Sequence, residues 1–388
     1  MRSFNLYNPT QVRFGEGRLD EVGEVVEIYG RRCLLVTGHT SKAKLFVYER
    51  VKKQLKEMGI EVLHFDGVVT NPTTDIVEDG VRLAIEHNVD VILGLGGGSS
   101  MDTAKAIAVG ATHSGKVWDY RLFGERKITD KTLPVIAVPT TSGTGSQVTP
   151  VAVITNPAEK FKSALVSPFL CPRACIVDPE LMLTVPERVT ASTGFDAFAH
   201  AFESYIHKNA SPYTELLAVE AMRIIVKYLP IVVEDGSNKE ARAWMAWADT
   251  LAGLCISNAG TTLPHGIAMA IGGHAPHVLH GEALAAIYPE FMRYTCDFSI
   301  KKFAILGRIL NPELERVPDK VAASKSCEEM EKFLQKINLC FGLKQLNVHE
   351  NEIASIAADS VKLPDYKVNP RVATVDEIVE ILTRSYSR

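Results

Sequence analysis

Residues 91–100 have the sequence VILGLGGGSS. The apolar run at 91–95 predicts a buried strand, and the residues from 100 to 108 have the pattern of a helix. Gly96, Gly97 and Gly98 therefore connect a strand to a helix N-terminus, whose free N–H groups can bind a pyrophosphate. As a GxGxxG motif the match is degenerate, because Ser99 takes the third glycine position. The stretch predicts either phosphate binding or a tight structural turn.

The same alternation of short apolar runs and helical patterns extends through the first half of the chain. It is typical of βαβ units around a parallel sheet. Beyond Pro186, long segments with helical periodicity dominate. We therefore predict a Rossmann-like α/β nucleotide-binding domain over residues 1–183 and an all-helical domain over residues 184–388. The predicted strands are 34–36, 62–65, 91–95, 133–138 and 174–177, and the predicted helices are 44–56, 75–86, 100–108, 191–206, 213–228, 242–255 and 283–293.

A second candidate loop follows the strand predicted at 133–138. Residues 139–146 read PTTSGTGS, so hydroxyl groups and glycines follow the strand directly. Alone, this loop could be a capped turn. The carboxyl ends of parallel strands share one edge of a sheet, however, so the two loops should lie side by side where ligands bind. Together they predict a nucleotide site.

Asp102 and Lys105 lie three residues apart on the helix predicted after the glycines. This spacing puts both side chains on one face, where they could form a surface ion pair. Alternatively, Lys105 lies near the phosphates or the ribose of a bound nucleotide.

Four residues of the second half predict a metal site. Asp196 and His200 are four residues apart in an apolar helical pattern, so both point the same way from a segment expected to be buried. A buried carboxylate beside an imidazole needs a partner charge. His265 and His280, each followed by glycine, add two imidazoles, and this set suits Fe²⁺ or Zn²⁺ with a position left for substrate oxygen. Glu203 continues the face of Asp196 and is interpreted as structural or as a support for the ligands.

The composition is that of an ordinary globular protein. The 388 residues are 46% apolar and 23% charged with a net charge of −4, which predicts two or three domains and no nucleic-acid partner. The odd number of cysteines, scattered through apolar segments, indicates reduced thiols rather than disulfides, and Cys171 and Cys175 are expected in the core. No signal-peptide core and no long apolar window occurs. We expect a cytoplasmic protein with no membrane partner.

Taken together, these motifs resemble the iron-containing alcohol dehydrogenase family over essentially the whole chain. The resemblance rests on Gly96-Gly97-Gly98-Ser99 with Asp102 and Lys105, on residues 139–146, on Asp178-Pro179-Glu180-Leu181, on Asp196, His200 and Glu203, and on His265-Gly266 and His280-Gly281. It implies a dehydroquinate synthase-like architecture with a divalent ion in the cleft between the domains. The implied reaction transfers a hydride between a small alcohol or aldehyde and NAD(P).

The resemblance also implies the site residues. The metal ligands would be Asp196, His200, His265 and His280, and a homodimer would form by pairing of residues 4–14 with their copy. The expected cofactor contacts are Gly38, Asn71, Gly96, Gly97, Gly98, Ser99, Asp102, Thr140, Thr141, Thr144, Val153 and Lys162.

Several positions depart from the family pattern. Met269 stands where many members have a histidine that helps proton transfer, so the route of the proton is left open. Gln147 replaces the glutamate that is usual in the family. The stretch 272–280 is one residue longer than usual and contains three histidines. We favour His280 as ligand and catalytic group because Gly281 follows it, with His277 as its rival, and His274 or His277 could supply the missing proton relay.

The end of the first cofactor strand bears on the choice of coenzyme. NAD-preferring members often carry aspartate at the position of Gly38, where it bonds the ribose 2′-hydroxyl, so its absence favours NADP over NAD. Two other functions would place different demands on the sequence. A carbon–oxygen lyase or cyclase like dehydroquinate synthase would need more Lys and Arg between residues 196 and 282, and a non-catalytic regulator would not need both loops and all four ligands.

Overall fold

The computed structural model describes residues 3–39 and 42–388, which form two compact units. One unit is Asn8–Val185, and the other is Pro186–Arg388 together with the described residues that precede Asn8. The division therefore lies two residues beyond the boundary we expected after residue 183. Residues 3–7, which we expected in the first domain, group with the helical unit, where the Tyr7 N–H donates to Asn258 Oδ1 at 2.8 Å.

The first unit is built on a six-stranded sheet in which every paired strand is parallel, in the order β1-β8-β5-β4-β2-β3. All five predicted strands form, and the parallel α/β layer is confirmed. The sequence did not predict β1, because its four residues are partly exposed at the sheet edge and give no clear alternation. The strands are β1 (Gln11–Phe14), β2 (Arg32–Gly38), β3 (Glu61–Val68), β4 (Val91–Gly96), β5 (Val135–Pro139) and β8 (Ala174–Val177).

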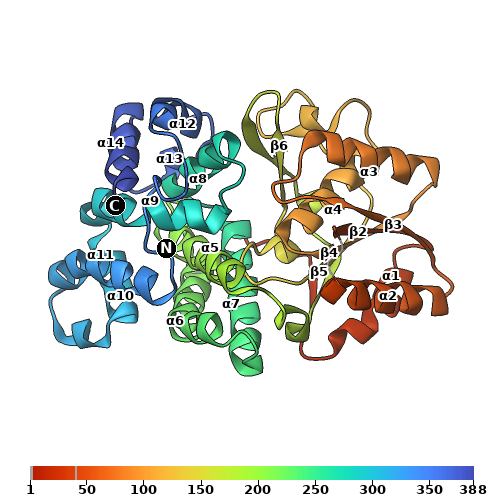
Figure 1. The fold of residues 1–388 in the computed structure, drawn as a ribbon, viewed down its shortest axis with the longest axis horizontal. Coiled ribbons are helices and arrows are strands. Elements are labelled where there is room, and N and C mark those ends of the chain that lie inside the picture. Colours follow the sequence, from red (N-terminus) through yellow and green to blue (C-terminus); the bar gives the residue numbers. More distant parts are fainter. Residues whose placement is uncertain (1–2, 40–41) are drawn as a thin grey trace. The chain divides into compact units, whose positions relative to one another are not determined.

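Helices cover both faces of this sheet, with α1 and α2 on one side and α3 and α4 on the other (Figure 1). Leu35 packs towards α1 and α2, whereas Leu34 and Val36 pack towards α3 and α4. Successive side chains of a strand point to opposite faces, so a sheet buried on both faces needs continuous apolar runs. The helices are α1 (Val22–Glu27), α2 (Lys42–Glu57), α3 (Thr74–Glu86) and α4 (Gly98–Gly110).

The same unit contains a two-stranded antiparallel sheet that the sequence did not predict. It consists of β6 (Val151–Asn156) and β7 (Phe161–Val166). The hairpin is joined to the loop after β3, because the Thr155 N–H donates to the Pro72 carbonyl at 2.8 Å and Thr155 forms a parallel bridge with Thr73. These long-range contacts hold strands whose own sequence pattern is weak.

The second unit is helical, as predicted. Its central helix, α5, is buried along nearly its whole length, and α6, α7 and α9 pack against it. A helix that is apolar on all sides requires such enclosure. In the described part of the chain, no helix is long and apolar enough to span a membrane. The helices are α5 (Glu187–Ile206), α6 (Pro212–Glu234), α7 (Lys239–Asn258), α8 (Leu263–His274), α9 (His280–Thr295), α10 (Ile300–Leu310), α11 (Asp319–Lys336), α12 (Ile353–Ser360), α13 (Asp365–Val368) and α14 (Val375–Tyr386).

Candidate functional site

The buried helix α5 carries the first two candidate ligands. Asp196 is 3% exposed and His200 is 6% exposed, so both side chains lie inside the helical unit. Their spacing of one helical turn places His200 Nε2 at 3.7 Å from Asp196 Oδ1. The carboxylate of Asp196 and the imidazole of His200 therefore lie next to each other, as their spacing predicted.

Helices α8 and α9 bring two more imidazoles to the same carboxylate. His265, in the first turn of α8, places Nε2 at 3.5 Å from Asp196 Oδ1, and His280, the first residue of α9, places Nε2 at 3.8 Å from it. The rings of His200 and His265 stack with their centroids 4.6 Å apart. Three imidazole nitrogens from three helices thus converge on one oxygen atom.

The converging atoms have the chemistry and spacing of a cation site. Asp196 Oδ1 and His265 Nε2 are both buried, and neither has a hydrogen-bond partner among the described residues. A buried carboxylate oxygen without a partner is costly, and a cation would satisfy it. Ligands at about 2.1 Å from a tetrahedral ion lie about 3.4 Å from one another, close to the separations found here. The residues fit a divalent Fe²⁺ or Zn²⁺ ion.

Glu203 contacts the candidate ligand His265 on the side of the ring that faces away from Asp196. Its Oε1 lies 2.7 Å from His265 Nδ1, and its Oε2 accepts the Thr262 N–H at 2.8 Å. Because an ionised carboxylate can only accept, Nδ1 carries the hydrogen and Nε2 is left to face Asp196. Of the two interpretations of Glu203, the geometry supports the one in which it orients a ligand.

The electrostatics of this group keep the carboxylate of Asp196 charged. Burial by itself would raise the pKa of Asp196, but the imidazoles of His200, His280 and His265 together outweigh burial and lower it. Burial would also lower the pKa of His265, yet Glu203 and Asp196 raise it to about 10 in the metal-free protein. The site is therefore one in which positive charge is strongly stabilised.

Gly281 explains why α9 can bring His280 close to α5. A Cβ atom at this glycine would lie 1.9 Å from the carbonyl oxygen of Ser192 on α5. Beside it, the buried Glu282 accepts two hydrogen bonds from Arg188, at 2.5 Å from Nε and 2.8 Å from Nη2. Gly281, the residue for which the sequence analysis favoured His280, is therefore required for α9 to approach α5 this closely.

The other two histidines of the long stretch are held elsewhere. His274 Nε2 lies 2.8 Å from Asp359 Oδ2, and the exposed His277 lies with Nε2 at 3.0 Å from the Leu346 carbonyl. Among the described residues, the potential ligand atoms that gather around Asp196 do not include either histidine. The structure therefore does not bring the rival ligand His277, or the relay candidates, to the group around Asp196.

The two predicted loops of the first unit are in contact. The Thr140 N–H donates to the Gly96 carbonyl at 2.9 Å, and a Cβ atom at Gly98 would lie only 2.6 Å from Thr144 Cγ2. Gly97 is the N-cap of α4 and lies against Thr141. The helix N-terminus and the hydroxyl-rich loop thus meet at the carboxyl edge of β4 and β5, the edge at which parallel sheets bind ligands.

Two other cofactor candidates, Asp102 and Asn71, are each bonded to a candidate residue of the hairpin β6–β7. Asp102 Oδ2 accepts the Val153 N–H at 3.0 Å, and Lys162 Nζ donates to Asn71 Oδ1 at 3.0 Å. Gly38 ends β2, where it pairs with β3.

Lys105 differs from the expectation of a surface ion pair. Its side chain is fully buried, so that interpretation is wrong. The spacing of three residues could not reveal this, because the surrounding oxygens come from a segment more than 40 residues away.

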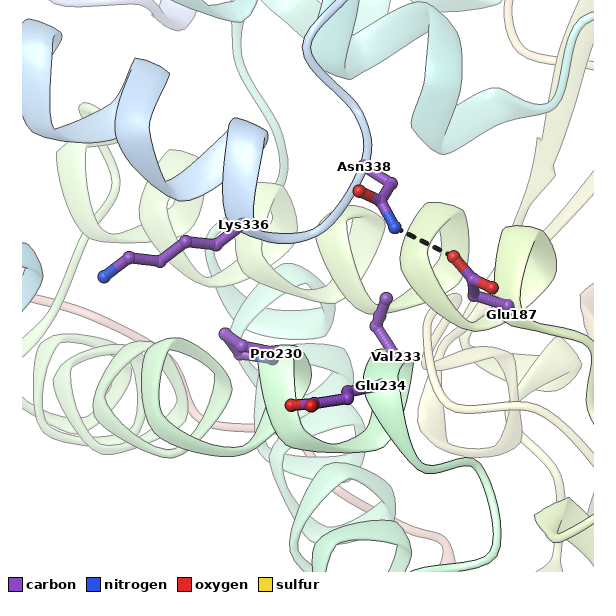
Figure 2. Close-up of a pocket in the computed structure, with 6 residues that line it drawn as sticks. All are labelled: Glu187, Pro230, Val233, Glu234, Lys336 and Asn338. Atoms are coloured by element: carbon purple, nitrogen blue, oxygen red, sulfur yellow. Dashed lines mark hydrogen bonds between the residues drawn. The ribbon is translucent and has the colours of Figure 1, made fainter.

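A hollow in the helical unit is lined by residues other than the candidate ligands (Figure 2). It measures about 410 Å³ and includes Asn338, whose Nδ2 donates to Glu187 Oε1 at 2.8 Å. None of the residues that line it belongs to the predicted site, and the mixture of charges gives no ligand preference. The lining residues are Glu187, Pro230, Val233, Glu234, Lys336 and Asn338.

The chain is similar to known alcohol dehydrogenases over nearly its whole length. The profile of the iron-containing alcohol dehydrogenases matches residues 9–179, and the C-terminal profile of the same family matches residues 190–386. The NAD-dependent methanol dehydrogenase of Bacillus methanolicus is 33% identical over 378 residues, 97% of this chain and 98% of that protein. The 1,3-propanediol dehydrogenase of Citrobacter freundii is 35% identical over 99% of each chain. The structure of an archaeal halo-thermophilic alcohol dehydrogenase from a Red Sea brine pool superposes with a TM-score of 0.94 at 36% identity, covering 99% of this chain and 100% of that one.

Proposed function

The chain belongs to the iron-containing alcohol dehydrogenase family, and from this premise we propose how its own residues carry out the reaction. It is an oxidoreductase that transfers a hydride between an alcohol and a nicotinamide coenzyme. We assign the resident divalent ion, Fe²⁺ or Zn²⁺, to Asp196, His200, His265 and His280. The observation that carries this assignment is the convergence of three imidazoles on one buried carboxylate oxygen that has no hydrogen-bond partner among the described residues.

Asp196, His200, His265 and His280 would hold the ion that activates the hydroxyl group of the substrate. When bound, a divalent ion supplies Lewis-acid chemistry, which lowers the pKa of an alcohol from about 16 and polarises the carbonyl in the reverse direction. Asp196 provides the negative charge that a cation needs in a buried site. Glu203 accepts the His265 Nδ1 hydrogen and so presents Nε2 to the ion.

The coenzyme is assigned to the edge of the sheet where the two loops meet. The N–H groups at the start of α4, with Gly97, Gly98 and Ser99, suit the pyrophosphate. Thr140, Thr141 and Thr144 offer hydroxyl donors beside it. NAD is the coenzyme of the methanol dehydrogenase relative, and we propose that this chain also accepts NADP, because Gly38 has no carboxylate to repel a 2′-phosphate.

We further propose a cytoplasmic homodimer. Among the described residues, β1 lies at an edge of the sheet and has only β8 as a neighbour. Phe4, Leu6 and Tyr7 are exposed apolar residues. An exposed strand edge and exposed apolar side chains suit pairing with a second copy. Light scattering in solution tests this, and a monomeric mass would overturn it. The cytoplasmic location is supported by seven cysteines that form no disulfide.

The reaction is tested by stripping and restoring the metal. The protein is treated anaerobically with a chelator, Fe²⁺ or Zn²⁺ is restored separately, and absorbance of the reduced nicotinamide is followed with NAD⁺ and NADP⁺ over a panel of short alcohols. We expect reduction that depends on the metal. If no alcohol is oxidised although metal and nucleotide bind tightly, the dehydrogenase assignment fails and phosphorylated substrates of a lyase become the next candidates.

A further inference from the structure

Lys105 of α4 is a buried ammonium group inside the nucleotide-binding unit. Its exposed fraction is 0%, and Nζ lies within hydrogen-bond distance of three carbonyl oxygens, those of Ser146 at 2.7 Å, Val151 at 2.8 Å and Thr149 at 3.0 Å. The hydroxyl oxygens of Ser146 and Thr149 lie at 2.9 and 3.3 Å. An ammonium group has three N–H donors, so these carbonyls occupy them all. Lys105 therefore has no donor left for a coenzyme phosphate.

Asp102, one turn earlier on α4, binds the same segment with the opposite charge. Its Oδ1 accepts the Ser146 hydroxyl hydrogen at 2.6 Å, and its Oδ2 accepts the Val153 N–H at 3.0 Å. Together, Asp102 and Lys105 fasten the chain from Ser146 to Val153 onto α4. We call Asp102, Lys105 and the groups of Ser146–Val153 that they bind the α4 clamp.

The α4 clamp begins where the hydroxyl-rich loop ends. Thr144, two residues before Ser146, lies against Gly98 in the first turn of α4 so closely that a Cβ atom at Gly98 would clash. One helix thus carries both the N–H groups that suit the pyrophosphate and the charged pair that fixes the facing loop. A displacement of Ser146 would move Thr144 away from the helix N-terminus.

Burying an ammonium group is expensive even when a carboxylate accompanies it, and an apolar side chain of similar size is often at least as stable. The charge at Lys105 therefore calls for a reason other than stability. Of the roles that remain, fixing the loop geometry agrees with all the contacts above.

We propose that Lys105 is a positioning residue for coenzyme binding: with Asp102 it holds the loop 140–149 against the first turn of α4 in the arrangement that receives the dinucleotide. This inference rests on the proposed assignment of the coenzyme to the two loops. It predicts a specific effect on coenzyme affinity, with little effect on the metal centre of the other unit.

The direct test is Lys105→Met in the metal-loaded enzyme. We expect the dissociation constant for NADH, measured by fluorescence, and the KM for NAD⁺ to rise about tenfold or more, since small displacements at a binding site have effects of this size or larger. The kcat at saturating coenzyme, the KM for the alcohol and the metal content should stay within about twofold of the wild-type values. This change is well below the tenfold effect, about 1.4 kcal/mol, expected for coenzyme binding. An unchanged dissociation constant would refute the proposal.

Lys302→Met is the matched control. Lys302 also donates to a backbone carbonyl, that of Tyr205, and pairs with Glu215 at 2.7 Å, but it lies in the helical unit. This variant should lower the melting temperature without changing coenzyme affinity. If it weakens NADH binding as much as Lys105→Met does, the effect is general destabilisation and the proposal fails.

The pH dependence adds a readout that a purely structural role would not move. Burial lowers the pKa of Lys105 to about 8, with Asp102 opposing this and Cys171 the other titratable group that faces it. Above this pH the amine has two N–H donors for three carbonyls. The ratio of dissociation constants, variant to wild type, should therefore fall towards one between about pH 8 and pH 10. A constant ratio would count against the mechanism.

A second variant decides the matter if Lys105→Met does not fold. Ser146→Ala removes the hydroxyl that joins Asp102 to Lys105 and leaves both charged side chains in place. We expect a smaller loss of NADH affinity in the same direction, and no loss would overturn the proposal. The coenzyme assignment on which this inference rests fails in a different way, because wild-type protein would then bind neither NADH nor NADPH.

Discussion

His265 Nδ1 lies 2.7 Å from Glu203 Oε1, on the opposite side of the ring from the Nε2 atom that faces Asp196. Both side chains are buried, and the second oxygen of Glu203 is held by the Thr262 N–H. The hydrogen bond holds the plane of the imidazole and keeps the hydrogen on Nδ1 whether or not Nε2 is protonated. Such supports are part of a metal site because they set the direction and basicity of the ligand nitrogen.

Glu203→Gln should weaken metal binding without removing a ligand. The amide keeps the shape of the side chain but no longer bears the charge that favours Nδ1–H, so metal affinity should fall about 10- to 100-fold. Competition with a chromophoric chelator measures this. Glu215→Gln, a change to a partly exposed carboxylate in the same unit, is the control and should leave the affinity as it is. Equal affinities for wild type and Glu203→Gln would show that Glu203 is structural only.

The two glycines that follow the proposed ligands His265 and His280 should respond differently to alanine. In Gly281→Ala the new Cβ would lie 1.9 Å from the Ser192 carbonyl oxygen, so α9 and His280 must move away from α5. We expect a loss of about 1–3 kcal/mol in stability and a reduced metal content. In Gly266→Ala the nearest atom, Asp365 Cβ, is 3.4 Å away, which is an ordinary contact. Thermal unfolding and metal analysis of both variants test this, and similar losses in the two would contradict the helix-approach argument.

Gly38→Asp should shift the coenzyme preference towards NAD. The new carboxylate would stand at the end of β2, where it can bond a ribose 2′-hydroxyl and repel a 2′-phosphate. The site has room for the first side-chain atom, because the nearest contact of a Cβ atom would be the Val68 carbonyl oxygen at 3.4 Å. We expect kcat/KM for NADP⁺ to fall about tenfold relative to NAD⁺, a change of about 1.4 kcal/mol. An unchanged ratio would mean that Gly38 does not face the ribose.

The thiols should react as reduced core residues. Cys340 is exposed and the other six cysteines are buried. Burial raises the pKa of Cys33 and of Cys255 to about 12, so both stay protonated at pH 8 and react slowly. A colorimetric thiol reagent should therefore modify one cysteine rapidly in the native protein and all seven after denaturation. Rapid modification of several cysteines in the native protein would contradict the described core.

The sequence predicted the elements that depend on local pattern. The strand 174–177 coincides with β8, because its apolar residues are enclosed on both faces. The helix α5 begins at Glu187, four residues before the predicted start, since its first turn contains polar residues without helical periodicity. Asp196 and His200 could be paired from their spacing alone.

Long-range contacts account for what the sequence could not predict. The hairpin β6–β7 has a buried lysine, Lys162, that interrupts its apolar pattern and is held by Asn71, 91 residues away. The burial of Lys105 could not be predicted from its spacing to Asp102, because its acceptors lie on the distant segment from Ser146 to Val151. The convergence of His265 and His280 on Asp196 likewise depends on the packing of α9 against α5 and of α8 against α9.

The most direct test of the central claim compares metal content and turnover in single ligand variants. His200→Ala and His265→Ala each remove an imidazole that lies within 3.7 Å of Asp196 Oδ1. Both variants should lose the divalent ion and, with it, the oxidation of alcohol, while NADH binding to the other unit is retained. A variant that has lost the metal but still oxidises alcohol at the wild-type rate would contradict the mechanism.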